Sequence, residues 1–323
     1  MTQEQSDSKR GLLVTFEGGD GAGKSTQIRF LARFLEERGH EVLRLREPGG
    51  TAVGEALRRV VLDPAHGAMS DRAELLIYEA ARAQIVDEVI APALARGAVV
   101  LCDRFYDSTV AYQGAGRGLD GFFIEAANRF ACDGLVPDAT ILLVAPEDVV
   151  RSRMGRRSGA DRLERAGDEF HRRVAAGFDE LAAADPARVR RVCSQQQRTD
   201  TFRAILNELA PLLPEAAEAL ADDGGLEALV NEVMAEKRRE RERERKRDQA
   251  RKRRRSGKGD AKRGASGKGG AAGKRSGADG EAKGAGEAAG AKSGKNRKKG
   301  DARKDGGRKG RRGEKGSKGE RRG

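Results

Sequence analysis

A glycine-rich segment near the start of the chain restricts its possible folds more than any other feature. It reads Gly18-Gly19-Asp20-Gly21-Ala22-Gly23-Lys24-Ser25 and fits the pattern G-x-x-x-x-G-K-[ST]. An apolar run at 12–16 precedes it, and residues 25–38 follow it with Ile28, Leu31 and Leu35 at helical spacing. This motif forms a phosphate-binding loop when it lies between a buried strand and a helix. The segment therefore predicts a site for a nucleoside triphosphate.

The residue types of this loop indicate how it binds the phosphates. Its glycines let backbone N–H groups turn inward, and the helix that follows adds its partial positive charge. Lys24 is expected to reach the outer phosphates, and the hydroxyl of Ser25 to bind Mg²⁺. The predicted nucleotide-binding residues are Gly18, Gly19, Asp20, Gly21, Ala22, Gly23, Lys24, Ser25 and Thr26.

Strand and helix patterns alternate along the first two thirds of the chain. We expect strands at 12–16, 41–46, 98–102, 138–144 and 188–192, the central ones continuously apolar. Thr51 is a predicted N-cap for a helix to Leu62, and Ser70 or Asp71 for a long helix that ends at Gly97. Four further helices are expected: one at 120–133, one that starts at Pro146, one that ends at about Ala184, and one from Thr199 to about Pro211. Buried parallel strands joined by helices predict a three-layer α/β/α P-loop NTPase fold with a five-stranded parallel sheet.

Charge divides the chain into an acidic body and a basic tail. Residues 1–236 contain 29 Lys and Arg against 39 Asp and Glu, whereas residues 237–323 contain 35 against 12. Such asymmetry suggests an interaction segment. From Ser256 the chain has no aromatic or β-branched residue, so it cannot form a core and is predicted to be disordered. The expected domains are a flexible N-terminus at 1–10, the P-loop domain at 11–213, a linker with a possible charged helix at 214–255, and the disordered tail at 256–323.

Cysteine usage and hydropathy exclude several classes of protein. The three cysteines are odd in number and far apart, which is typical of reduced thiols in an intracellular protein. The first ten residues are polar, and no apolar run has the length of a membrane span. The sequence therefore predicts a cytoplasmic protein with no membrane segment.

Asp103 and Arg104 directly follow the apolar strand at 98–102. An aspartate at the end of such a strand is typical of a carboxylate near Mg²⁺ and the phosphates, with a loop-capping role as the alternative. Arg104 is then positioned for the phosphate of an acceptor. The predicted metal ligands are Ser25 and Asp103.

Several further segments resemble the thymidylate kinases, the bacterial enzymes that phosphorylate dTMP with ATP. The most specific are Arg-Glu-Pro-Gly-Gly at 46–50 and Ala-Tyr-Gln-Gly at 111–114. The others lie at 16–26, 78–82, 103–105 and 161–164, so the resemblance extends from residue 11 to about 192 and includes none of the tail.

The resemblance implies roles for individual residues. Tyr78 matches an aromatic residue that stacks on thymine, although phenylalanine is commoner there, and Arg82 matches a residue that bonds the acceptor edge of the base. A spacing of four places both on one helix face. The full set of implied substrate-binding residues is Asp20, Arg58, Tyr78, Arg82, Arg104, Thr109, Tyr112 and Gln113. The family also implies ATP and Mg²⁺ as cofactors and a homodimer packed through long helices.

Phosphoryl transfer requires positive charge over the transferring group. Some family members carry an arginine inside the phosphate loop, but this chain has Asp20-Gly21 there. The charge is instead expected from Arg153, Arg156 and Arg157, which lie in a segment similar to the family's closing lid and are called the lid arginines below; Arg162 lies just downstream. Together with Lys24, Asp103 and Arg104 they complete the predicted catalytic set. After the fifth strand the chain departs from the family's adenine-bordering segment, so no adenine contacts are predicted.

Two alternatives to a dTMP kinase remain open at this level. The acceptor could be another nucleoside monophosphate. The protein could instead act chiefly as a binder of nucleic acid or another polyanion through its basic tail, because such a tail can neutralise many phosphates. Against this, the tail has no aromatic residue that could stack on bases. A merely solubilising tail is a further alternative.

Overall fold

The computed structural model describes residues 10–146, 149–150, 161–194 and 197–264. The helix predicted from Pro146, the lid arginines and the tail from residue 265 fall largely or wholly outside these ranges. Two compact units divide the chain at Asp260, and the fold below is that of the first unit.

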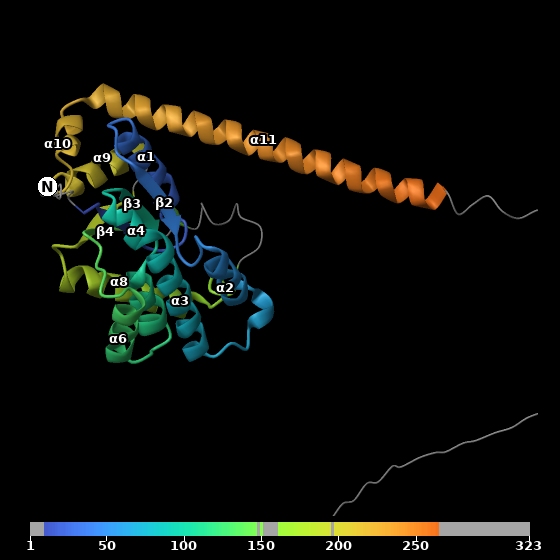
Figure 1. Ribbon diagram of the computed structural model, residues 1–323, viewed down its shortest axis with the longest axis horizontal. Coiled ribbons are helices and arrows are strands. Elements are labelled where there is room, and N and C mark those ends of the chain that lie inside the picture. Colours follow the sequence, from blue (N-terminus) through green and yellow to red (C-terminus); the bar gives the residue numbers. More distant parts are fainter. Residues whose placement is uncertain (1–9, 147–148, 151–160, 195–196, 265–323) are drawn as a thin grey trace, which may run out of the picture. The chain divides into compact units, whose positions relative to one another are not determined.

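A five-stranded parallel sheet forms the centre of this unit (Figure 1). Its strands are β1 (Leu13–Glu17), β2 (Val42–Arg46), β3 (Val99–Asp103), β4 (Ala139–Val144) and β5 (Val189–Cys193). They lie in the order β2-β3-β1-β4-β5 and all pair in parallel. The predicted number of strands and their direction are therefore confirmed, each strand beginning within one residue of its predicted start.

Helices connect successive strands and follow the last one. They are α1 (Lys24–Glu36), α2 (Ala52–Leu62), α3 (Asp71–Ile85), α4 (Ala91–Ala95), α5 (Tyr106–Thr109), α6 (Gly121–Ala131), α8 (Asp168–Ala184), α9 (Arg198–Leu209), α10 (Pro214–Leu220) and α11 (Asp223–Gly264). Thr51 and Ser70 cap α2 and α3, as predicted, by accepting a hydrogen bond from the backbone N–H three residues later.

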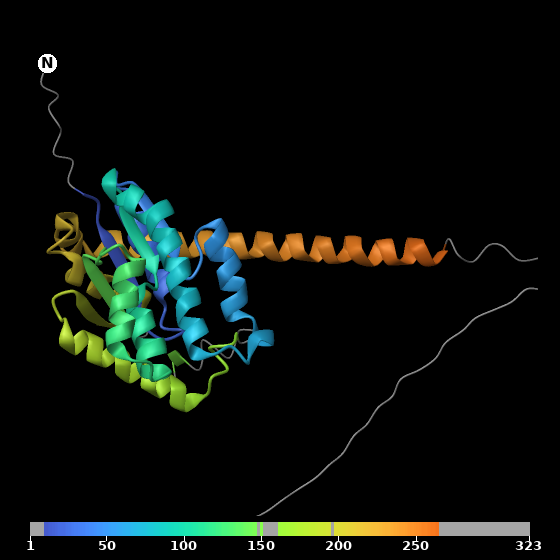
Figure 2. The same ribbon diagram turned by 60° about the horizontal axis from the view of Figure 1, so that its bottom comes forward.

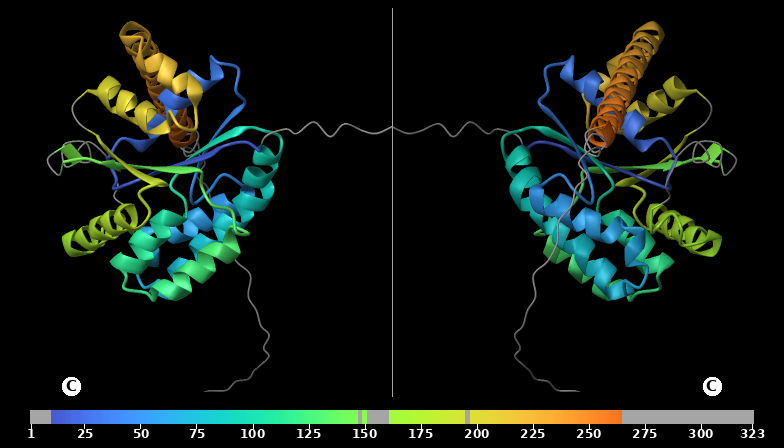
Figure 3. Two further views of the ribbon diagram at one scale, coloured as in Figure 1. Left: turned by 90° about the vertical axis from the view of Figure 1, so that its left-hand side faces the viewer. Right: turned by 90° about the vertical axis from the view of Figure 1, so that its right-hand side faces the viewer.

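Two helical layers cover the sheet, which Figure 3 shows edge-on. On one face the core joins β1, β3 and β4 to α1, α9, α10 and the first turns of α11 through residues such as Phe30, Phe202 and Leu226. On the other face, one cluster packs α3 and α4 against β1 and β3, and a second packs α8 against β4 and β5. Helices α3 and α6 lie side by side on this face (Figure 2). The three-layer prediction is confirmed.

The long helix predicted from residue 71 to Gly97 is not a continuous α-helix. A π-helical turn, η2 (Val86–Ile90), separates α3 from α4. Pro92 lies in the first turn of α4 and has no backbone N–H to donate to the preceding turn. A wider turn at this point accommodates the missing hydrogen bond.

The sequence predicted no element at 106–116, yet this segment is helical. It forms α5 and then the π-helical η3 (Val110–Gly116), whose Ala111 and Tyr112 are buried against α8. Short helices with many small residues lack a clear apolar period, so tertiary contacts with α8 decide this conformation.

Helix α11 is continuous across the boundaries predicted near residues 236 and 255, and it ends at Gly264. Its first turns carry Leu226, Leu229, Val230 and Val233 into the core. No helix in the described ranges is both long and apolar enough to cross a membrane.

Candidate active site

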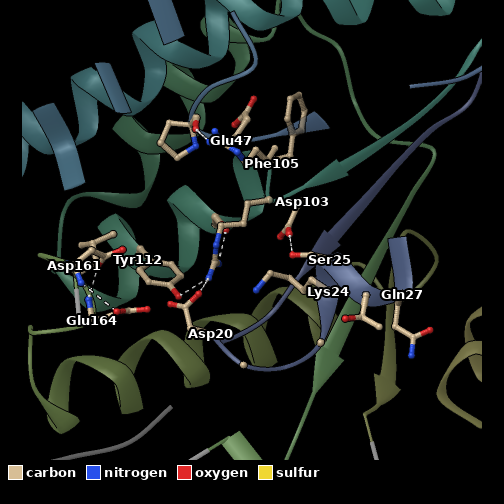
Figure 4. A pocket seen from close by; sticks show the side chains of 18 of the residues that line it. Asp20, Lys24, Ser25, Gln27, Glu47, Asp103, Phe105, Tyr112, Asp161 and Glu164 are labelled. Atoms are coloured by element: carbon tan, nitrogen blue, oxygen red, sulfur yellow. Dashed lines mark hydrogen bonds and ion pairs between the residues drawn. The ribbon is translucent and has the colours of Figure 1, made fainter. Parts of the chain in front are cut away.

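A cavity of about 630 Å³ lies beyond the carboxyl ends of β1, β2 and β3 (Figure 4). This is where open α/β sheets bind ligands, and the volume suits small molecules. Elements far apart in the sequence line it: the phosphate loop, the segments after β2 and β3, helices α2, α3, α9 and α11, the helical segment 106–116 and residues 161–164. Of the predicted site residues in the described ranges, those outside the glycine loop all line this cavity.

The phosphate loop adopts a conformation that requires its glycines. Gly18 has φ +120°, and a Cβ there would lie 2.2 Å from the carbonyl oxygen of Leu143 in the neighbouring β4. Gly23 has φ +107° and is the N-cap of α1. The loop closes on Lys24, whose Nζ donates to the carbonyl oxygens of Gly18 at 2.9 Å and Gly19 at 3.1 Å. Burial lowers the pKa of Lys24 to about 8, so the free loop stabilises a cation less well than water does.

Ser25 and Asp103 meet at the edge of this loop, as Figure 4 shows. Because β1 and β3 pair in parallel with Phe16 opposite Asp103, the loop after β1 lies beside the end of β3. The hydroxyl of Ser25 donates to Oδ2 of Asp103 at 2.6 Å. Both groups offer hard oxygen ligands of the kind that Mg²⁺ prefers.

Within the described ranges, no three or more His, Cys, Asp or Glu side chains converge to hold a metal. A site with two protein oxygens suits Mg²⁺, because this ion keeps several waters and takes its other ligands from the nucleotide phosphates. The donor set at Ser25 and Asp103 thus fits the predicted ion.

Arg104 is held in the middle of the cavity by an unusual backbone conformation. Its φ is +70°, a region that non-glycine residues rarely adopt and that is enriched at functional sites. Its guanidinium donates to Asp20 Oδ1 at 2.8 Å, to Ser108 Oγ at 3.2 Å and to the Tyr112 hydroxyl at 3.2 Å. The predicted residues Asp20, Arg104 and Tyr112 therefore form one network.

Glu17 stabilises the backbone conformation at Arg104 by binding the residues that follow it. Glu17 was not identified as a site residue from the sequence. The fully buried carboxylate accepts from the backbone N–H groups of Phe105 at 2.7 Å and Ser108 at 3.2 Å, and from Ser108 Oγ at 2.6 Å. Burial raises the pKa of Glu17 to about 7. Its position, the last residue of a buried strand directly before the phosphate loop, is the signal that could have identified it.

Arg82 is buried and bonded on several sides. Its Nε donates to Glu47 at 2.9 Å, and its Nη1 to Glu79 at 2.8 Å, to Thr109 Oγ1 at 3.0 Å and to Asn128 at 3.0 Å. Among the described residues, these bonds use Nε and Nη1 only, so Nη2 is the donor that remains for a ligand. The predicted pair of Arg82 and Thr109 is in direct contact.

Gln113 is oriented by a second buried carboxylate, Glu74. Its Nε2 donates to Glu74 Oε1 at 2.7 Å. Glu74 is fully buried and also pairs with Arg117 at 3.0 Å and with Arg162. Arg162 further donates to the carbonyl oxygen of Val61 at 2.9 Å. It is thus bound to the protein scaffold and is not among the residues lining the cavity.

Tyr78 and Arg58 line the cavity beside the segment after β2. The Nη1 of Arg58 donates to the carbonyl oxygen of Pro48 at 2.9 Å. Tyr78 packs against the cluster that contains Tyr112 and Phe170. Burial raises the pKa of the Tyr78 phenol, which therefore stays protonated at neutral pH.

The end of the predicted lid reaches the same cavity. Asp161 and Glu164 cap each other's backbone, with Oδ1 of Asp161 accepting from the N–H of Glu164 at 2.9 Å and Oε2 of Glu164 accepting from that of Asp161 at 3.1 Å. The lid arginines themselves lie outside the described residues.

One side of the cavity was not predicted at all. After β5 and in α9, the lining residues are Ser194, Arg198 and Thr201; in α11 they are Met234, Lys237 and Arg241. Nothing local in the sequence indicates that a charged helix after the domain returns to the phosphate loop.

Comparison with known proteins gives one consistent result. Residues 16–205 match the family model described as thymidylate kinase. The chain is 48% identical over 204 residues to the thymidylate kinase of Cutibacterium acnes, a match that covers 63% of this chain and 98% of that protein. It is 52% identical to the thymidylate kinase of Synechococcus sp. strain JA-3-3Ab, covering 62% and 97%. The crystal structure of thymidylate kinase from Ehrlichia chaffeensis matches at 30% identity with a TM-score of 0.52, covering 62% of this chain and 99% of that one.

Proposed function

The chain belongs to the thymidylate kinase family and phosphorylates dTMP to dTDP with ATP, and we propose that the cavity described above performs this transfer with the following division of roles. The observation that carries the assignment of roles is the arrangement of the cavity. The phosphate-binding groups of the loop after β1 line the same cavity as an aromatic residue and two arginines, Tyr78, Arg82 and Arg58.

The donor ATP binds to the phosphate loop and the start of α1. The loop's backbone N–H groups hold the inner phosphates, and Lys24 leaves the carbonyl oxygens of Gly18 and Gly19 for the outer phosphates. Phosphate binding should stabilise the charged form of Lys24 strongly, because this buried ammonium, whose pKa is lowered in the free loop, then acquires an anionic partner. Ser25 and Asp103 would hold Mg²⁺, which supplies charge neutralisation for the transferred group.

The acceptor dTMP binds among Tyr78, Arg82, Arg58 and Arg104. Tyr78 stacks on thymine, and Arg82 donates Nη2 to an acceptor atom on the base edge while Thr109 accepts a hydrogen bond from Nη1. Arg58 and Arg104 hold the acceptor phosphate, for which arginine has suitable bidentate geometry. Tyr112, Gln113 and Asp20 contact the base and the deoxyribose.

Two tests separate these roles. With ATP and Mg²⁺, the purified protein forms ADP far faster with dTMP than with dUMP, dCMP, dGMP or AMP; a flat or shifted acceptor profile contradicts the assignment of the acceptor pocket. Arg82→Lys keeps the charge but removes the planar fork, so it raises KM for dTMP with little change in KM for ATP. An equal change in both constants would argue against a base-reading role.

We further propose that the protein forms a homodimer through α3 and α6. The phenylalanines of α6 are exposed, Phe122 by 83% and Phe130 by 88%, and Leu76 of α3 by 57%. Exposed apolar patches of this kind mark interaction surfaces. Sedimentation should give twice the chain mass, and Phe122→Ser with Phe130→Ser should give a monomer. Wild-type protein that sediments as a monomer at micromolar concentration excludes this interface.

The basic tail supports a second, separate activity in binding nucleic acid. Residues 256–323 contain 22 Lys and Arg against 8 Asp and Glu, a net charge of +14, enough to neutralise many phosphates. Deleting residues 256–323 should abolish salt-sensitive retention on DNA or RNA columns and leave turnover unchanged. Absence of retention of the full chain at low salt excludes this role.

A further inference from the structure

Helix α11 begins outside the matched family region, which ends at residue 205, yet it is firmly attached to the domain. Four of its side chains, Leu226, Leu229, Val230 and Val233, are buried in the same core as α1 and α9. The first turns of α11 are therefore a fixed part of the fold.

Ion pairs to α1 continue this attachment toward the phosphate loop. Arg33 of α1 pairs with Glu232 of α11 at 2.7 Å, and Arg29 pairs with Glu240 at 3.0 Å. Together they define how α11 lies along α1, because the partners are four residues apart on α1 and eight apart on α11. The interval between 232 and 240 therefore lies along the middle turns of α1 and runs from Arg33 toward the start of that helix.

This position brings Lys237 to the start of α1. Its Nζ donates to the Thr26 hydroxyl at 3.0 Å. Arg241 follows four residues later on the same helix face, and both residues line the cavity together with Met234. Thr26 lies in the first turn of α1, whose backbone N–H groups face the inner phosphates of a nucleotide in a phosphate loop.

Positive charge gathers here, and the nearby carboxylate, Glu240, is already paired with Arg29. Arg198 of α9 also lines the cavity and lies close enough to Lys237 to repel it. Among the described residues, no acidic group lies within ion-pair distance of Lys237, Arg198 or Arg241, and nearby Glu240 is paired with Arg29. Burial, and then repulsion from Arg241, Arg29 and Arg198, lowers the pKa of Lys237 to about 8. Cations brought together in a partly buried cavity in this way are typical of a site that binds an anion.

We propose that α11 supplies a donor-nucleotide subsite in which Lys237 and Arg241 bind the α-phosphate of ATP or ADP. This inference rests on the proposed kinase site, since it takes ATP to be the occupant of the phosphate loop. The α-phosphate is chosen because Lys24 serves the outer phosphates, while Thr26 and Lys237 lie further along α1. The subsite adds charge from a helix outside the family match to a loop whose own sequence carries Asp20-Gly21 and no arginine.

The test compares two double variants of the full chain. Lys237→Ala with Arg241→Ala removes the proposed contacts. Arg239→Ala with Arg243→Ala removes the same charge at the same spacing, from exposed positions of α11 that do not line the cavity. The dissociation constants of ATP, ADP and dTMP are measured by titration calorimetry, and KM values by a coupled assay. Circular dichroism melting checks that both variants fold.

The first variant should bind ATP and ADP about tenfold more weakly, because hydrogen bonds to charged groups are stronger than neutral ones but Lys237 is only partly buried and Arg241 is exposed. Its affinity for dTMP should be unchanged, and the control variant should bind all three ligands like wild type. Lys237→Arg should retain most of the ATP affinity, whereas Lys237→Glu should lose more than Lys237→Ala.

Three results overturn the proposal: unchanged ATP affinity in the first variant, an equal loss in the control variant, or tighter ATP binding when Lys237 is removed. The last would mean that Lys237 occludes the site. Each of these can occur while wild type remains an active dTMP kinase, so failure of the subsite is distinguishable from failure of the proposed function. Wild-type protein without ATP binding would instead refute the proposed function itself.

Discussion

Replacing Gly18 with alanine tests whether the phosphate loop depends on the packing of β1 against β4. An alanine Cβ at this position would lie 2.2 Å from the carbonyl oxygen of Leu143, about 0.8 Å closer than such atoms approach in real structures. The obstacle is backbone in the neighbouring strand, which cannot rotate away. The residue would also keep φ at +120°, a conformation that costs L-residues about 1–3 kcal/mol. Together these effects should lower the free energy of unfolding by about 2–4 kcal/mol.

The same change should also weaken nucleotide binding. The carbonyl oxygen of Gly18 accepts a hydrogen bond from Lys24 in the free loop, so a displaced Gly18 moves the loop around that lysine. Gly19→Ala is the matched control for stability, because its Cβ would meet nothing within 4 Å and its φ needs no glycine. Urea denaturation measures the free energy of unfolding of each variant, and calorimetry measures ADP affinity. Equal stability of the two variants would refute the steric argument.

Four further predictions concern the chemistry of the site. Ser25→Ala and Asp103→Asn should each lower kcat by a factor of order 10² and raise the Mg²⁺ concentration needed for half-maximal rate. Ser25→Thr, which keeps the hydroxyl, should show neither effect. An unchanged Mg²⁺ dependence in the first two variants argues against Ser25 and Asp103 as metal ligands. Neutralising all three lid arginines should lower kcat by a factor of order 10² or more, and near-normal turnover would exclude the lid as the source of charge. In the variant lacking Lys237 and Arg241, ADP affinity should fall as pH rises through about 8, because Lys24 loses its proton in the free site and must regain it to bind phosphate. Calorimetry in two buffers should then detect proton uptake, and constant affinity from pH 7 to 9.5 would contradict the lowered pKa. Arg82→Met should lower the free energy of unfolding by about 3–5 kcal/mol, measured in urea, because it leaves two buried carboxylates without their cation; a loss below 1 kcal/mol would show that the buried network contributes little.

Local patterns determined the sheet and the donor loop. The apolar strands, the glycine motif and the caps at Thr51 and Ser70 act within a few residues of chain, and so they can be read directly from the sequence. Ser25 and Asp103 were predicted as metal ligands from their places after apolar strands, whereas the pairing of β3 with β1 that brings them together comes from the structure. The strands and the donor loop were predictable, and the contact between these two residues was not.

The tertiary structure alone decided how the predicted side chains are held. Arg82 has buried partners from the segment after β2, from α3, from α5 and from α6. Glu17 stabilises the left-handed conformation of Arg104 across 88 residues of chain. Such contacts depend on burial and on distances between elements, and no periodic pattern in the sequence encodes them.

Helix α11 is the clearest example of contacts that the sequence pattern does not encode. Its sequence indicates a charged helix, and its composition indicates attraction to polyanions. Only the packing of four apolar residues on the core, with the ion pairs to α1, brings Lys237 and Arg241 to the phosphate loop. The sequence determined that this chain binds nucleotide phosphates. The folded arrangement decided which distant cations lie beside the phosphate loop, because electrostatic interactions act through space between residues that are far apart in the chain.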